Sequence, residues 1–469
     1  MAVRRYARWL LRASLVLLGV GVGPAVVSAH DIAGSRFDAP IPLPLLLAGA
    51  GATVALTALW LAVTDRKRTP GERRRHVFTV SRSLAEPLQI ASKGLFLAVV
   101  GVAIAVGVLG RQVAATNLAT VFTWPVWFRG LALLALVVGN PWQFLSPWRT
   151  IYDALVRLEG RPFALLGTYP TALGDWPAVV GFIVLIGFVE NLTVIPQSPR
   201  LTAVTLAVYA LVMLGGVLLY GETWLSRVDP LGAFYRLFGR VGALDSSKTD
   251  EGGFRVAIRP PWQGCLSPLR STALVVFVVT LVYTVSFDGF TETRLFQTLL
   301  FGTRDVFRTG PGTSVLIYLG GLVGFVGLFG AGSWLADRLG TPKTESWVDA
   351  MRWFAPTVLP IAGAYEVAHN YPYVIRNLGQ LLVIGTQWVP GTAGEVQLLG
   401  WLSLPLFWGS QVVLIVLGHV IAVVAAHNVA LDRYKSRRAA RQGHFPLVVL
   451  MIGFTVVSLW IISQPVVTG

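Results

Sequence analysis

The chain has 469 residues, of which 54% are hydrophobic and only 13% are charged. A soluble domain carries about 25% charged residues, so this composition indicates a membrane protein. The net charge of +15 does not indicate nucleic acid as a partner, because the basic residues fall in loops between apolar stretches.

Residues 1–29 are predicted to be a secretory signal peptide. Residues 10–22 are apolar, and Val-Ser-Ala at 27–29 is a small-residue cleavage site. Four arginines form the basic region: Arg4, Arg5 and Arg8 precede the apolar stretch, and Arg12 lies at its beginning. The alternative is an uncleaved first helix. Cleavage would place His30 at the new N-terminus, where its amine and ring nitrogen are candidate ligands for copper.

Residues 30–469 are predicted to form one transmembrane domain, because no loop reaches the ~50 residues of the smallest independent domains. The expected fold is all-α, a bundle of about ten membrane-spanning helices, since about 20 apolar residues cross a bilayer. The ten apolar spans are 43–64, 90–110, 117–138, 175–195, 201–221, 271–289, 313–334, 353–374, 402–426 and 446–464.

The loops between these spans are strongly asymmetric in charge. The loops at 65–88 and 222–270 carry seven Lys or Arg residues each, whereas the alternate set of loops holds seven in total. Basic residues favour the cytoplasmic side of a membrane. We therefore expect a plasma-membrane protein with the mature N-terminus and the C-terminus outside. The single cysteine, Cys265, lies in an inner loop and excludes an intramolecular disulfide.

The eighth span, Phe354 to Val374, reads FAPTVLPIAGAYEVAHNYPYV and carries Glu366 and His369. At a spacing of three residues they share one helix face. Pro372 cannot donate to the carbonyl four residues back, so the Ala368 carbonyl is expected to be free beside His369. Ionisable groups inside a membrane usually mark a working site. The alternative is a buried polar cluster that only locks helices together.

Other polar residues are expected at a similar depth in neighbouring spans. Arg129, near the middle of the third span, is the expected counter-charge for Glu190 or Glu366. The remaining polar residues lie toward the outer ends of the spans: Asn117, Glu190, Asn191 and Asp288. Together they suggest a shared cavity that opens outward. For Asn117 and Asp288 a capping role at the membrane surface is the alternative.

The ninth span contains His419 and His427, which are separated by about 12 Å along a helix, so they cannot hold one metal ion together. For each, a packed histidine bonded to a neighbouring helix is the structural interpretation, and a proton relay or haem ligand is the functional one. His76 and His444 lie in basic inner loops and are expected to be solvated.

Five stretches resemble a family of prokaryotic, especially haloarchaeal, polytopic membrane proteins often labelled "fenitrothion hydrolase". They are AHDIAGSRFDAPIPLPLLLAGA at 29–50, GNPWQFLSPWR at 139–149, SFDGF at 286–290, the eighth span, and LGHVIAVVAAHNVAL at 417–431. The resemblance implies a multi-pass membrane protein that hydrolyses an organophosphate ester. It brings no catalytic residues to this chain, which lacks GxSxG, HExxH and Walker A motifs.

Three functions remain open: a transporter or handler of a small solute or ion, a membrane hydrolase, and a metal- or haem-binding membrane protein. The candidates for substrate binding or proton carrying are Glu366, His369, Glu190, Asn191, Arg129 and Asp288. The sequence does not identify a cofactor. A metal ion is one candidate, with His369, Glu366 and His30 as its candidate ligands. The expected partners are the lipid bilayer and the solute or ion.

Overall fold

The computed structural model describes residues 42–64, 74–340, 346–386 and 396–464. The predicted signal peptide and His30 lie outside these residues. The fold is 78% helical. Within the described ranges, eight helices are long and apolar enough to cross a membrane: α2 (Leu43–Thr64), α3 (Arg82–Leu109), α4–η2–α5 (Leu118–Val138), α9 (Pro199–Tyr220), α12 (Thr272–Thr291), α14 (Thr313–Gly340), α17 (Leu404–Arg433) and α18 (Arg437–Ile462).

The other two predicted spans also fall on helices, but these differ from the eight. The fourth span is α8 (Trp176–Phe182) followed by the π-helix η4 (Ile183–Glu190), which together are apolar but shorter than the rest. The eighth is α16 (Leu359–Thr386), which is 28 residues long and carries Glu366, His369 and Arg376. The count of ten spans therefore remains a prediction.

Shorter elements connect the long helices. The short helices are α6 (Trp142–Leu145), α7 (Pro147–Glu159), α10 (Glu222–Arg227), α11 (Pro230–Phe238), α13 (Arg294–Phe307) and α15 (Trp347–Phe354). The 3-10 turns are η1 (Ala114–Thr116), η3 (Thr171–Leu173), η5 (Ile195–Gln197), η6 (Gln263–Cys265) and η7 (Ala355–Val358).

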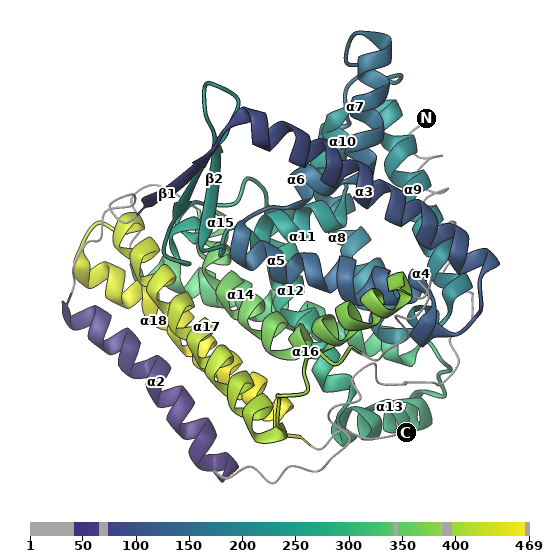
Figure 1. Ribbon diagram of the computed structural model, residues 1–469. Helices are drawn as coiled ribbons and strands as arrows, with labels where there is room; N and C mark the ends of the chain where they lie inside the picture. Colours follow the sequence, from purple (N-terminus) through teal and green to yellow (C-terminus); the bar gives the residue numbers. More distant parts are fainter. Residues whose placement is uncertain (1–41, 65–73, 341–345, 387–395, 465–469) are drawn as a thin grey trace.

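A small sheet departs from the all-α prediction. Strands β1 (Arg75–Val80), β2 (Leu244–Lys248) and β3 (Phe254–Ile258) form an antiparallel sheet in the order β1-β3-β2. It lies at the end of the molecule opposite α13 (Figure 1). Both basic loops, 65–88 and 222–270, supply its strands. The strands from these two loops therefore lie on the same side of the bundle, as the charge asymmetry predicts. The strands escaped the sequence analysis because hydropathy identifies spans and not short pairings in polar loops.

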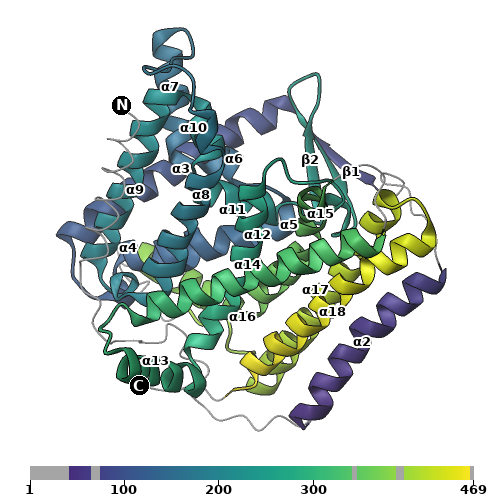
Figure 2. The ribbon, with the colours of Figure 1, turned by 180° about the vertical axis from the view of Figure 1, so that it is seen from behind.

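The helices differ in how much of their surface the protein covers. Helix α2 packs along α17 and α18 at one edge of the bundle, as both views show (Figures 1 and 2). Helix α12 contacts α8, α14 and α16, and 83% of its apolar stretch is buried inside the protein. A polar side chain on α12 is therefore directed into protein rather than lipid, which is where ionisable groups in membrane helices are found.

The first residues of α8 and α12 and the last turn of α15 meet at the end of the bundle that carries the sheet. Asp175, just before α8, accepts a hydrogen bond from Ser271, which caps α12. The Leu269 N–H donates to the Arg352 carbonyl in α15, the helix that leads through η7 into α16. Helices α8, α12 and α16 therefore run in the same direction from this end.

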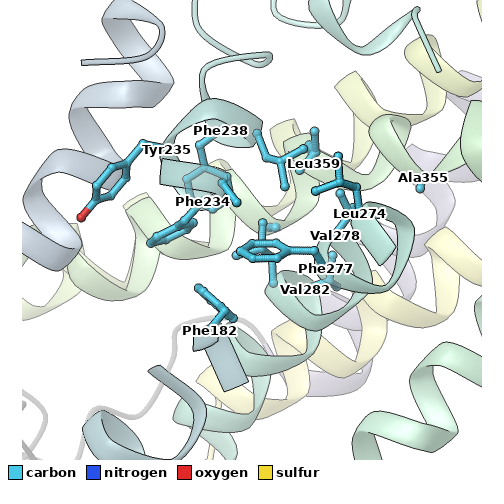
Figure 3. Close-up of a cluster of buried hydrophobic side chains, with 14 of the residues drawn as sticks. Phe182, Phe234, Tyr235, Phe238, Leu274, Phe277, Val278, Val282, Ala355 and Leu359 are labelled. Carbon is cyan, nitrogen blue, oxygen red and sulfur yellow. The ribbon is translucent and has the colours of Figure 1, made fainter. Parts of the chain in front are cut away.

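A layer of apolar side chains, here called the aromatic layer, follows next along the same helices. Phe182 of α8 lies between Phe234 of α11 and Phe277 of α12, with ring centroids 5.3 Å and 4.9 Å away. Leu359 of α16 belongs to the same cluster (Figure 3). All four side chains are at most 1% exposed. This aromatic layer separates the sheet end of the bundle from the polar residues further along.

Candidate functional site

Five ionisable side chains predicted from the sequence meet in one group, here called the polar cluster: Arg129, Glu190, Asp288, Glu366 and His369. The Arg129 Nε donates to Glu190 Oε1 at 2.8 Å, and its Nη1 donates to both carboxylate oxygens of Glu366 at 3.1 Å. Its Nη2 lies 3.7 Å from Asp288 Oδ2. His369 Nε2 lies 3.3 Å from the same Asp288 oxygen. The expected counter-charge role of Arg129 is confirmed for both glutamates.

The polar cluster is deeply buried. The side chains of Arg129 and Glu366 are 2% and 0% exposed, and those of His369 and Asp288 are 9% and 16% exposed. Removing charges from water costs several kcal/mol per ion, and mutual attraction offsets this only with good geometry and full pairing. Burying this cluster therefore costs free energy that its ion pairs must offset. Its least buried member is Asp288.

Two π-helices lead into the cluster. η2 (Phe122–Gly130) carries Arg129, and η4 ends at Glu190. Helices with this wider turn are rare and occur often at functional sites. Pro125 lies inside η2, where it cannot donate a backbone hydrogen bond. The wider turn changes which residues share a helix face, so spacing in the sequence does not predict where Arg129 points.

Tyr235 of α11 supports η2 and was missed by the sequence analysis. Its hydroxyl lies 3.1 Å from the Trp127 carbonyl oxygen and 3.2 Å from that of Phe128, and donates to them. The side chain is fully buried, and its ring belongs to the aromatic layer (Figure 3). Tyr235 therefore links the aromatic layer to η2, the element that carries Arg129. A tyrosine in a predicted cytoplasmic loop carries no sequence signal for such depth.

The carbonyl beside His369 is not free, contrary to the prediction. The Gln411 Nε2 of α17 donates to the Ala368 carbonyl oxygen at 3.3 Å. Helix α16 continues through Pro372 to Thr386. A side chain from a neighbouring helix thus satisfies the group that the proline leaves unbonded, as often happens in membrane helices.

The two asparagines have different surroundings. Asn117 caps α4: its Oδ1 accepts from the Ala119 N–H at 2.9 Å, and its Nδ2 donates to the Arg111 carbonyl at 2.8 Å. The capping interpretation is confirmed for Asn117. Asn191 follows Glu190 directly, and its Nδ2 is buried without a hydrogen-bond partner. Asn191 is therefore adjacent to the cluster with an unused donor.

The histidines of α17 and α18 have other partners than the polar cluster. His419 Nδ1 is 2.8 Å from the Ile415 carbonyl of its own helix, so the expected bond to a neighbouring helix is wrong. His444 is 4% exposed and its ring centroid lies 5.5 Å from that of His427. The expectation that His444 is solvated is wrong because α18 begins at Arg437 and carries it into the bundle.

No group of three or more His, Cys, Asp or Glu side chains within the described ranges is arranged to hold a metal ion. Of the candidate ligands, Glu366 directs both oxygens at Arg129, and His369 faces Asp288. The cluster, as it stands, is organised around a guanidinium.

A second charged group, here called the Asp175 cluster, lies at the sheet end of the same helices. Asp175 is 1% exposed and forms ion pairs with Arg227, at 3.2 Å, and with Arg270. Ser271 donates to its Oδ2 at 2.5 Å. Both carboxylate oxygens are thus paired. The sequence analysis missed this group because its members are spread over a hundred residues in loops.

The chain matches no protein-family model, no curated protein and no solved structure. Its class therefore follows from the fold and the site: a helical integral membrane protein with a cluster of charged side chains buried among its helices.

Proposed function

We propose that the protein is a multi-pass transporter of a small solute or ion, with the polar cluster as its working site. The observation that carries the proposal is the sharing of one buried guanidinium among three carboxylates. Glu190, Asp288 and Glu366 come from three separate elements, η4, α12 and α16. Such intramembrane ionisable groups commonly mark substrate, ion or proton pathways.

The arrangement suits a site whose helices move against one another. Arg129 does not hold the three carboxylates equally, because its contact with Asp288 is the longest at 3.7 Å. A ligand or proton that changes the charge of one carboxylate changes the pairing of the other two. Because the partners lie on different elements, a change in pairing alters helix contacts, and differential binding of this kind shifts conformational populations.

The proposed topology keeps the features expected from the sequence. The protein has ten spans in the plasma membrane, a cleaved signal peptide, and both mature termini outside. The pairing of β1 with β3 supports this topology, since it joins two loops that both belong to the inner set. The aromatic layer then lies on the inner side of the polar cluster, and Asp288 lies toward the outer side.

A thermal-shift screen of the purified protein in detergent tests the transport proposal. Small organic and inorganic anions, cations and zwitterions are added singly to wild type and to Glu366→Gln. We expect at least one solute to raise the melting temperature of wild type but not of the variant, and proteoliposomes to accumulate that solute. Stabilising solutes that act equally on both proteins would contradict the assignment of the site.

Ester hydrolysis is the alternative function, and the Asp288–His369 contact favours it. A carboxylate that orients a histidine is a common way to activate water or a hydroxyl group. The family resemblance noted above points to the same chemistry. Cleavage of an organophosphate ester by wild type, abolished in His369→Ala and unaccompanied by uptake of any stabilising solute, would favour the hydrolase.

A further inference from the structure

The charges of the polar cluster do not balance. Arg129 contributes one positive charge, and His369 contributes a second only when it is protonated. Against them stand three carboxylates: Glu190, Asp288 and Glu366. With every acid ionised, the cluster is negative by at least one charge. A buried charge without compensation is so costly that such a group normally neutralises instead.

The three carboxylates are not equivalent in their hydrogen bonds. Both oxygens of Glu366 accept from Arg129. Asp288 Oδ2 lies near both Arg129 and His369. Glu190 uses only Oε1 to accept from Arg129, and its Oε2 is buried without a hydrogen-bond partner. An ionised carboxylate with one oxygen buried and unpaired is the least favourable of the three, so Glu190 is where a neutralising proton fits best.

A metal cation fits this position less well than a proton. Hard cations take about six to eight oxygen ligands. Three oxygens of Glu190 and Glu366 already accept from Arg129, and the described residues contain no three-ligand group for a metal. A proton needs only one oxygen. The groups that face Glu190 are Arg129 from η2, Asp288 from α12, Tyr235 from α11, and Glu366 and Tyr373 from α16.

Among the described residues, the exposure of the side chains indicates the side from which a proton can enter. Exposure rises from Glu366, at 0%, to Asp288, at 16%, and His369 touches Asp288. On the other side the aromatic layer follows directly, with Phe182 eight residues before Glu190 on the same helical run and no more than 1% exposed (Figure 3). Proton exchange is therefore favoured through Asp288 and His369.

We propose that Glu190 carries an exchangeable proton, which makes the proton the coupling ion of this transporter. Loss of the proton strengthens the pull of Glu190 on Arg129 and weakens the hold of Arg129 on Glu366, so one protonation event changes the link between η4 and α16. The coupling role of the proton rests on the proposed transport function. The protonation of Glu190 does not, and it is tested without any transport assay.

Infrared spectroscopy of the purified protein in D2O buffer, titrated with acid and base, tests the inference. A protonated carboxylic acid has a C=O stretching band that a carboxylate lacks. We expect wild type to show such a band at neutral pH, to lose it as the pH rises, and Glu190→Gln to lack it. Glu222→Gln is the matched control, because Glu222 is a 60% exposed partner of Arg149, far along the chain from the cluster. Its band should equal that of wild type.

A second measurement needs no variant. A hydrophobic carbodiimide adds to protonated carboxyl groups in apolar surroundings, and peptide mapping by mass spectrometry then identifies the modified residue. We expect modification at Glu190 in wild type, and less of it at high pH. Modification confined to Glu366 or Asp288, or an infrared band that persists in Glu190→Gln, would overturn the assignment. Absence of the band at every pH at which the protein is folded would overturn it as well. A titrating band without solute transport would support the proton site and contradict the transport proposal.

Discussion

The two charged clusters lie at opposite levels of the same helices and are built in opposite ways. The Asp175 cluster gives one carboxylate two arginines and a serine, and both carboxylate oxygens are paired. The polar cluster gives one arginine three carboxylates, and a buried oxygen of Glu190 is left unpaired. Donors are in excess at the first site and acceptors at the second.

This difference distinguishes a cluster that stabilises helix packing from a functional site. A fully paired buried carboxylate gains nothing from a proton or a ligand, so the Asp175 cluster is suited to holding the first residues of α8 and α12 together. A cluster with an excess of acid gains from any added positive charge. Sites that work are often locally suboptimal for stability. The comparison therefore predicts which substitutions destabilise the protein and which abolish its function while leaving it folded.

Arg129→Ala should have the largest effect on stability. It removes the only arginine from the polar cluster and leaves Glu366 buried without a donor from that side. Breaking a buried pair costs about 3–5 kcal/mol, so we expect little folded protein after extraction. Size-exclusion chromatography of a fluorescent fusion measures the yield of folded protein.

Arg149→Ala is the control for this substitution, because its partner Glu222 is 60% exposed. Exposed pairs contribute about 0–1 kcal/mol, so the control should be folded at wild-type yield. Equal yields for Arg129→Ala and Arg149→Ala would show that the guanidinium does not hold the carboxylates together.

Asp175→Asn should have the next largest effect. The amide keeps the shape of the carboxylate but loses its charge, and hydrogen bonds to charged groups contribute about 1.5–3 kcal/mol. Arg227 and Arg270 are 35% and 40% exposed, so both can turn toward water and limit the loss. We expect a lower melting temperature in detergent with solute-dependent stabilisation retained. A variant that melts like wild type but no longer responds to the solute would move the working site to this end.

His369→Ala should change stability less and function more. The histidine contacts Asp288 of the cluster at 3.3 Å, and its removal leaves Arg129 paired with both glutamates. We expect near-normal membrane levels with lost uptake or turnover. Full activity in this variant would remove His369 from the site.

Cys265 should show the smallest response of all. The thiol is completely buried, and burial raises its pKa to about 12, so almost none is present as the reactive thiolate at neutral pH. A maleimide should therefore leave Cys265 unlabelled in sealed and in permeabilised cells, and label it after denaturation. Labelling of the folded protein would show that the loop around η6 opens.

Hydropathy predicted the helices well, and the reason is physical. A backbone without water must bond to itself, so apolar stretches of sufficient length form helices. Glu190, Asp288 and Glu366 were predicted as site residues because a charged residue in an apolar stretch stands out. Arg129 was predicted as the counter-charge of Glu190 or Glu366. That all three carboxylates share it was not predictable, since two π-helices set which way the side chains point.

Other buried polar residues could not be recognised as charged residues within an apolar stretch. Asp175 lies at the edge of a predicted span and Tyr235 lies outside the spans, where a carboxylate or a tyrosine is ordinary, yet both are buried. Gln411 satisfies the Ala368 carbonyl from a different helix, and no local pattern links the two residues. Contacts between elements far apart in the chain depend on packing, and packing is what the sequence pattern leaves open.

The most direct test of the account compares Glu366→Gln with Asp175→Asn in the same preparation. Each replaces a buried carboxylate by an amide of nearly the same shape, and each is measured for melting temperature and for uptake of the solute that stabilises wild type. The account predicts that Glu366→Gln melts close to wild type and loses uptake, whereas Asp175→Asn melts earlier and retains uptake per folded molecule. If Glu366→Gln retained full uptake, or if both variants lost stability and uptake in proportion, the polar cluster would only stabilise helix packing. Its assignment as the functional site would then be wrong.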